Sequence, residues 1–152
     1  GLDLAGVGMQ GHFLVRDRAE PDLFIDVFDG GRLLDRDGCA AIYRRVTGAP
    51  VGPPPAQLEP VPTTMILRRM LGNLDAIHAR AQRRAELAWV RQLLARFPDV
   101  PPAARREVAQ LYAAAGRFIE AGRELLSLAD LVEGTEADSA RRDADRLFAR
   151  LN

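Results

Sequence analysis

Six prolines lie within residues 49–63 and divide the chain into two stretches of different character. They are Pro50, Pro53, Pro54, Pro55, Pro60 and Pro62. Proline lacks a backbone N–H and its ring clashes with the preceding helical turn, so neither a long helix nor a central strand tolerates this density. We therefore predict a proline-rich linker or extended strap over residues 49–63. It separates a domain over residues 1–48 from a second domain over residues 64–152.

Before the linker, residues 1–33 have the pattern of short β-strands. Apolar runs over residues 11–16 and 23–28 flank a polar turn at 17–21. An antiparallel hairpin about this turn pairs Leu14 with Phe24 and His12 with Asp26. Directly opposed residues have Cβ atoms about 4.5–5.5 Å apart, which allows an imidazole–carboxylate hydrogen bond. The sequence therefore predicts a His12–Asp26 pair, and a purely structural role for this pair stays open.

A short helix is expected directly after the β-rich stretch. Asp35 suits the position that caps a helix start, and Gly48 suits the left-handed position after the last turn. Cys39 falls in the first turn of this helix, where the helix dipole favours a thiolate. A small buried packing residue is the more common role of a free cysteine, and we favour it. As the single cysteine of the chain, Cys39 fits a reducing, cytoplasmic compartment.

From Thr64 onward, apolar residues recur at helical spacing. After Pro102, seven residues fit the tetratricopeptide pattern, in which small residues let two helices cross closely. They are Ala109, Tyr112, Gly116, Phe118, Ala121, Leu125 and Leu128. The preceding unit fits less well, because Glu86 stands where a small residue belongs and the turn at 81–83 lacks glycine. The prediction is an α+β chain: a small antiparallel sheet with one helix, then an all-α array of helical hairpins with a closing helix.

The charge balance of the chain argues against several classes of partner. The 21 acidic and 21 basic residues cancel, so no net field attracts nucleic acid or an anionic membrane. No apolar run approaches the roughly 18 residues that a membrane-spanning helix needs. No His or Cys spacing is typical of a metal site, and the turn at 29–31 lacks the Lys-Ser/Thr of a phosphate-binding loop. We expect no nucleic-acid partner, no membrane partner, no cofactor and no metal.

Three motifs in this order carry a resemblance to a known family. They are Gly8-Met9-Gln10-Gly11-His12-Phe13-Leu14-Val15-Arg16, Phe24-Ile25-Asp26-Val27-Phe28-Asp29-Gly30-Gly31-Arg32-Leu33-Leu34 and Met70-Leu71-Gly72-Asn73-Leu74. The chain resembles the C-terminal part of the bacterial SirB-type proteins, in which a transglutaminase-like domain precedes tetratricopeptide repeats. In such domains a cysteine attacks an amide, a histidine is its base, and an aspartate orients the histidine. The resemblance implies these last two roles for His12 and Asp26.

The nucleophile of this triad has no counterpart in the motifs. The resemblance places it upstream of His12, whereas Cys39 follows both partners. We therefore expect a non-catalytic protein whose helical half binds a protein or peptide. The alternative is a cysteine acyl-transferase or amidase/protease-like enzyme whose nucleophile lies upstream of Gly1, since nucleophile and base must lie within hydrogen-bond reach.

Overall fold

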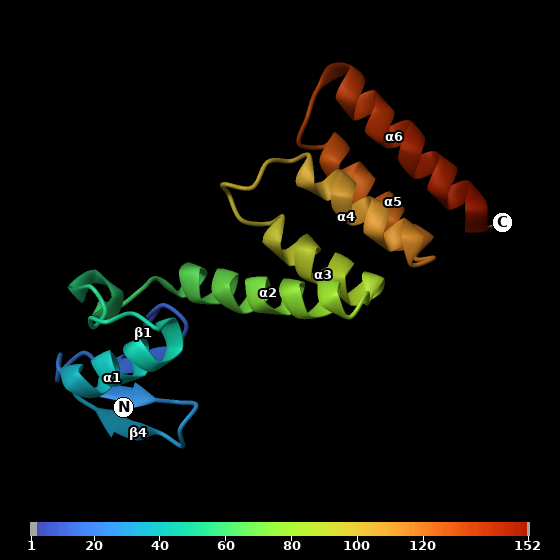
Figure 1. Ribbon diagram of the computed structural model, residues 1–152. Helices are drawn as coiled ribbons and strands as arrows, with labels where there is room; N and C mark the ends of the chain where they lie inside the picture. Colours follow the sequence, from blue (N-terminus) through green and yellow to red (C-terminus); the bar gives the residue numbers. More distant parts are fainter. Residues whose placement is uncertain (1–2, 152) are drawn as a thin grey trace. The chain divides into compact units, whose positions relative to one another are not determined.

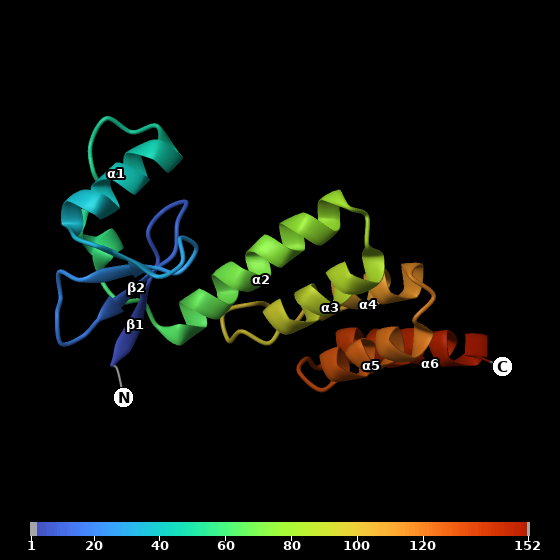
Figure 2. The ribbon, with the colours of Figure 1, turned by 90° about the horizontal axis from the view of Figure 1, so that it is seen from below.

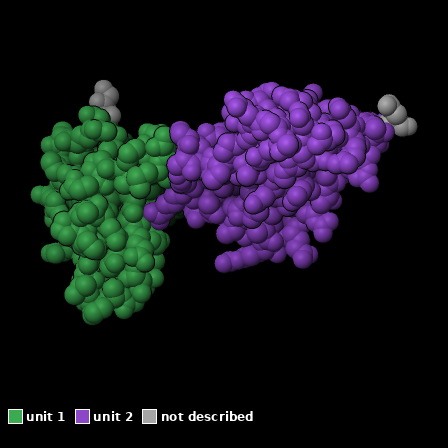
Figure 3. Space-filling model, turned by 90° about the horizontal axis from the view of Figure 1, so that it is seen from above, with its two compact units in different colours: residues 1–67 green, residues 68–152 purple. Residues whose placement is uncertain are grey.

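The computed structural model describes residues 3–151 and has the predicted α+β class, a four-stranded antiparallel sheet followed by helices. The chain divides into two compact units, Gly1–Leu67 and Arg68–Asn152, which Figure 3 shows in different colours. Within the described residues, no helix is both long enough and apolar enough to cross a membrane.

The sheet of the first unit is a meander of four short strands. The strands are β1 (Leu4–Val7), β2 (Leu14–Asp17), β3 (Phe24–Asp26) and β4 (Arg32–Leu34), in the spatial order β1-β2-β3-β4 (Figure 1). β2 pairs with β3 so that Arg16 lies opposite Phe24. The predicted register, with Leu14 opposite Phe24, is therefore wrong by two residues. Because side chains alternate with a period of two, this shift leaves every side chain on its predicted face.

The turn between β2 and β3 explains the shift in register. The Asp17 carboxylate accepts a hydrogen bond from the backbone N–H of Ala19 at 2.9 Å, which is a local turn that aspartate favours. The backbone N–H of Asp17 also donates to the carbonyl of Leu23 at 3.3 Å. Asp17 therefore belongs to the strand rather than to the loop, and the pairing moves with it.

Helix α1 (Arg36–Thr47) covers one face of the sheet. Asp35 caps its start by accepting a hydrogen bond from the Gly38 N–H at 2.8 Å, and Gly48 ends it with φ 73°. Both predicted helix boundaries are confirmed. The core between α1 and the sheet consists of Val7, Met9, Leu14, Phe24, Leu34, Cys39, Ile42, Tyr43 and Leu58.

The proline-rich segment runs along the outer edge of β1. The backbone N–H of Val61 donates to the carbonyl of Gly6 at 2.9 Å, and Arg16 donates to the carbonyl of Leu58 at 3.2 Å. The segment contains a short 3₁₀ helix, Pro55–Leu58, although the proline density predicted no helix there. Proline is tolerated at this helix because its ring lies in the first turn, where no N–H donor is required.

The second unit is a succession of packed helices. After α2 (Thr63–Arg80) come α3 (Arg84–Leu94), α4 (Ala104–Ala114), α5 (Phe118–Ala129), α6 (Gly134–Phe148) and the 3₁₀ helix Ala149–Leu151. From α3 to α6, each helix packs on the next (Figures 1 and 2). α5 and α6 approach closely because Gly122 has no side chain: a Cβ there would lie only 2.4 Å from the Phe148 ring of α6. Ala140 and Ala144 of α6 are fully buried.

Two turns of this array have the same backbone conformation. Gln82, between α2 and α3, has φ 53°, and Gly116, between α4 and α5, has φ 75°. Gly116 lies 34 positions after Gln82, and α5 begins 34 positions after α3. This spacing aligns Leu87 with Ala121. Leu87, and not Glu86 as predicted, therefore stands at the position of the small residue in the first pair of helices. The missing glycine of the first turn is replaced by a left-handed glutamine.

We expect Gln82→Gly to raise the free energy of unfolding by about 0.5–1 kcal/mol. Glycine relieves the left-handed strain of about 1–2 kcal/mol, and its greater freedom in the unfolded chain offsets part of this gain. Urea unfolding of the whole chain measures the change. Gln82→Ala keeps the Cβ and should give no gain. Equal stability of the glycine variant and the wild type would count against a strained turn.

Candidate functional site

His12 and Asp26 form the hydrogen bond that the sequence predicts. The Nε2 atom of His12 lies 2.9 Å from Oδ1 of Asp26. Continuing the observed register places Asp26 opposite Leu14, so His12 reaches the carboxylate diagonally from the turn before β2. Diagonal neighbours on one face of a sheet are within reach of long or aromatic side chains. The pair therefore depends on the shared face rather than on direct opposition.

The carboxylate of Asp26 is buried, with 2% of the residue exposed, and has several partners. Its Oδ1 also accepts the backbone N–H of Phe28 at 3.0 Å, and the Phe28 ring meets the imidazole edge-to-face at 5.6 Å between centroids. Burial by itself raises the pKa of Asp26. The hydrogen bonds from His12 and from the Phe28 N–H outweigh burial, so the pKa of this carboxyl lies below its ordinary value. Asp26 is therefore an anion at neutral pH.

The ionised carboxylate fixes which nitrogen of His12 carries a proton. A carboxylate only accepts hydrogen bonds, so Nε2 must donate and Nδ1 of the neutral ring has the free lone pair. Between residues 3 and 151, no hydrogen bond to Nδ1 is present. The His12 side chain is 16% exposed. Chemically, the pair is an oriented imidazole whose basic atom, Nδ1, points away from its carboxylate.

The turn before β2 holds His12 in place. The backbone N–H of His12 donates to the carbonyl of Met9 at 3.1 Å, and the Met9 side chain is fully buried. Gly11 has φ 76°, and a Cβ at this position would lie 2.4 Å from Cγ1 of Val46 in α1. Only glycine satisfies both the left-handed backbone and this close approach. Helix α1 therefore positions the turn that presents the imidazole.

Cys39 has the predicted buried packing position. It is fully buried in the core between α1 and the sheet. Burial, with a smaller contribution from the nearby Asp35 carboxylate, raises the pKa of the thiol to about 11. Desolvation thus exceeds the effect of the helix dipole that favours a thiolate. In the described part of the chain, no hydrogen bond joins Cys39 to His12.

A buried polar network between α3, α4 and α5 was not predicted from the sequence. Glu124 is 2% exposed and accepts hydrogen bonds from Gln92 at 2.5 Å and from Arg105 at 3.3 Å. Tyr112 extends the network, because its hydroxyl donates to Gln92 at 3.1 Å. One signal was available in the sequence: Glu124 lies four residues before Leu128, on the apolar stripe of its helix.

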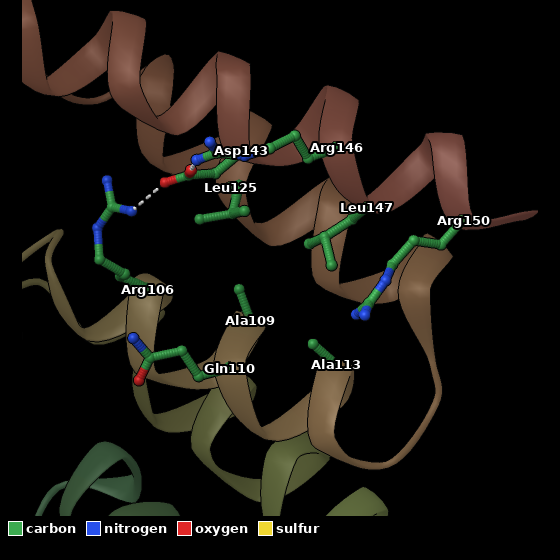
Figure 4. A pocket seen from close by; sticks show the side chains of 9 residues that line it. All are labelled: Arg106, Ala109, Gln110, Ala113, Leu125, Asp143, Arg146, Leu147 and Arg150. Atoms are coloured by element: carbon green, nitrogen blue, oxygen red, sulfur yellow. Dashed lines mark hydrogen bonds and ion pairs between the residues drawn. The ribbon is translucent and has the colours of Figure 1, made fainter.

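A groove of about 540 Å³ lies between α4, α5 and α6 (Figure 4). It is lined by Arg106, Ala109, Gln110, Ala113, Leu125, Asp143, Arg146, Leu147 and Arg150. Asp143 accepts a hydrogen bond from Arg106 at 2.8 Å and another from Arg146. The hydrogen bond from Arg106 is the main cause that lowers the pKa of Asp143. The groove therefore joins an aliphatic floor to a rim with three guanidinium groups.

The part of the chain that the structure describes contains no evident metal centre. Among residues 3–151, no group of three His, Cys, Asp or Glu side chains lies close enough to hold a metal ion. His78, which the sequence placed on an apolar helical face, is half-buried, and its Nδ1 is buried without a hydrogen-bond partner.

Comparison with known proteins finds a family match over part of the chain and similarity to two longer proteins. Residues 1–72 match the transglutaminase-like superfamily. A "UPF0162 protein" of Xylella fastidiosa strain 9a5c is 34% identical over 110 residues, which is 69% of this chain and 39% of the relative. Its counterpart in strain Temecula1 is 36% identical over 110 residues. The chain thus spans 39% of the length of these relatives. No solved structure matches it with statistical significance.

We expect Asp26→Asn to lower the free energy of unfolding by about 1–3 kcal/mol at pH 7, because a hydrogen-bonded buried anion is lost. A carboxyl with a lowered folded pKa stabilises the protein above its unfolded pKa of about 3.9 and loses this effect as pH falls through the folded pKa. The difference between variant and wild type should therefore shrink below about pH 4. Urea unfolding across this pH range measures it. Asp22→Asn, which removes an exposed carboxylate, is the control and should change little. A difference independent of pH would contradict the assignment.

Gly11→Ala should destabilise the protein more than Gly48→Ala. Both glycines are left-handed, so each alanine costs about 1–2 kcal/mol of backbone strain. Only Gly11 faces a neighbour, and overpacking against Val46 adds about 1–3 kcal/mol. Thermal unfolding of both variants gives the comparison. Equal losses would mean that α1 does not constrain the turn.

Proposed function

We propose, starting from the match of residues 1–72 to the transglutaminase-like superfamily, that this chain is a non-catalytic member whose helical unit binds a protein or peptide. The observation that carries the binding function is the groove between α4 and α6, which has an aliphatic floor and a charged rim. Sites that bind ligands are typically concave and mostly apolar, with a few polar groups that set orientation.

The absence of catalysis is inferred from the chemistry of the first unit. Acyl transfer by a cysteine triad needs a thiolate within hydrogen-bond reach of the base. The thiol that the described residues contain, Cys39, is buried and has a pKa of about 11. His12 and Asp26 then serve to hold the turn and the sheet together.

An enzyme remains the second candidate. The observation that favours it is the orientation of His12, whose Nε2 donates to Asp26 and whose Nδ1 is free. In that case the nucleophile belongs to a part of the protein that precedes this chain. The relatives, of which the chain spans 39%, leave room for such a part.

The helical unit is proposed to consist of tetratricopeptide repeats, as in the SirB-type proteins. The repeat length of that class is 34 residues, which is the spacing between the turns at Gln82 and Gly116. The buried Ala121, Leu125 and Leu128 of α5 support the same assignment. α6 then acts as the closing helix that covers the last repeat. A cytoplasmic location is part of this proposal.

Selection from a phage-displayed peptide library on the immobilised whole chain tests the binding function. We expect a recurrent peptide motif whose binding is lost in Leu147→Glu, which introduces a carboxylate into the groove. Leu131→Glu, at an exposed position outside the groove lining, should bind as the wild type does. Failure of any peptide to be enriched over an unrelated control protein would count against the proposal. Hydrolysis of an amide substrate by a longer protein that includes the segment preceding this chain, abolished by His12→Ala, would favour the enzyme instead.

A further inference from the structure

We propose that the groove between α4 and α6 binds an internal acidic peptide segment, in which an aliphatic side chain lies between side-chain carboxylates. This inference rests on the proposed binding function and names the chemistry of its ligand. It depends on three features of the groove: its charge, its floor and the placement of its arginines.

The lining of the groove has an excess of positive charge. Three arginines, Arg106, Arg146 and Arg150, stand against one carboxylate, Asp143. Arg106 and Arg146 share this carboxylate, so one anion neutralises only one of two cations. Each guanidinium has five N–H donors, and most of them stay available to a ligand. A ligand that brings carboxylates would therefore complement the rim.

Arg150 is the third arginine of the rim, and its guanidinium contacts the Phe118 ring rather than a carboxylate. Its guanidinium lies over Phe118 at 5.1 Å from the ring centroid. Stacking on an aromatic face holds the planar group in one orientation without neutralising its charge. Within residues 3–151, Arg150 has no ion pair with an acidic side chain. It is thus a preoriented cation at the rim.

The floor of the groove selects for an aliphatic side chain. Ala109, Ala113, Leu125 and Leu147 provide the apolar surface, and no aromatic side chain is among the lining residues. Single-stranded nucleic acid is bound mainly by stacking its bases on aromatic side chains, in addition to contacts with phosphate. The aliphatic floor lacks such a platform. It therefore favours a peptide over a nucleic acid as the anionic ligand.

The placement of the arginines favours an internal segment over a chain terminus. Arg106 and Arg146 meet at Asp143, toward one end of the groove, whereas Arg150 lies toward the other end, near Ala113 (Figure 4). A single terminal carboxylate would engage one end only. Side-chain carboxylates on both sides of an aliphatic residue would engage both ends while that residue occupies the floor.

Fluorescence anisotropy with a defined probe tests this inference. The probe is the fluorescein-labelled peptide Ser-Glu-Glu-Leu-Leu-Glu-Glu-Ser with blocked ends, so that all its carboxylates belong to side chains. We expect saturable binding by the whole chain at low salt. Arg146→Gln and Arg150→Gln should each weaken binding about two- to fivefold, as for partly exposed ion pairs, and together about tenfold. Peptides with Gln for Glu, or with Ser for Leu, should bind more weakly.

Arg141→Gln is the matched control for Arg146→Gln. Both arginines lie on α6 and pair with an aspartate three residues earlier, but the Arg141–Asp138 pair lies outside the groove lining. The control should bind the probe as the wild type does, and circular dichroism verifies that every variant is folded. Equal losses in both variants, equal binding of the Gln peptide, or tighter binding of an oligothymidylate than of the probe would each overturn the inference.

Failure of this inference is separable from failure of the proposed function. If library selection yields neutral or basic peptides whose binding Leu147→Glu abolishes, the groove binds peptides but its ligand is not acidic. If neither the library nor the acidic probe gives binding, both the function and its ligand are rejected.

Discussion

The first unit depends on the hydrogen bonds that the buried carboxylate of Asp26 accepts. An ionised group out of water is strongly destabilising unless it is paired and hydrogen-bonded. Asp26 meets this requirement at its Oδ1 atom, which accepts from both His12 Nε2 and the Phe28 N–H, while its carbonyl accepts from the N–H groups of Asp29 and Gly31. One residue thereby joins the turn before β2, the strand β3 and the turn that leads to β4. The imidazole is oriented as a consequence, whether or not a reacting group ever faces it.

The second unit also contains a buried carboxylate, Glu124, within a set of closely packed helices. Small residues bring its helices close together: Gly122 leaves space for the Phe148 ring, and the alanines of α6 are fully buried. The buried carboxylate of Glu124 is satisfied by hydrogen bonds from Gln92 and Arg105. The groove lies between α4, α5 and α6, and α4 contributes the short side chains of Ala109 and Ala113 to its floor.

The elements that the sequence predicts are those that depend on local rules. Asp35 and Gly48 bound α1 because capping and left-handed termination act within one turn. The His12–Asp26 pair was predictable although the register was wrong, because the side-chain period of two decides the face and tolerates a shift of two. Gln82 was not predictable as a left-handed residue, since glutamine rarely adopts this conformation. Glu124 and the groove depend on which helices become neighbours, and a single sequence does not state that.

The local arrangement of charges is further information that only the fold provides. Equal numbers of acidic and basic residues argue against a general attraction to polyanions, because at long range the fields cancel. Within about one Debye length, roughly 8–10 Å, the local arrangement of charges dominates instead. The helices place two arginines at one aspartate and a third arginine toward the other end of an aliphatic floor, so a neutral chain acquires a positive groove. If it binds a ligand as proposed, such a groove would discriminate by the combined spacing of charge and apolar surface, which suits a short peptide better than an extended polyanion.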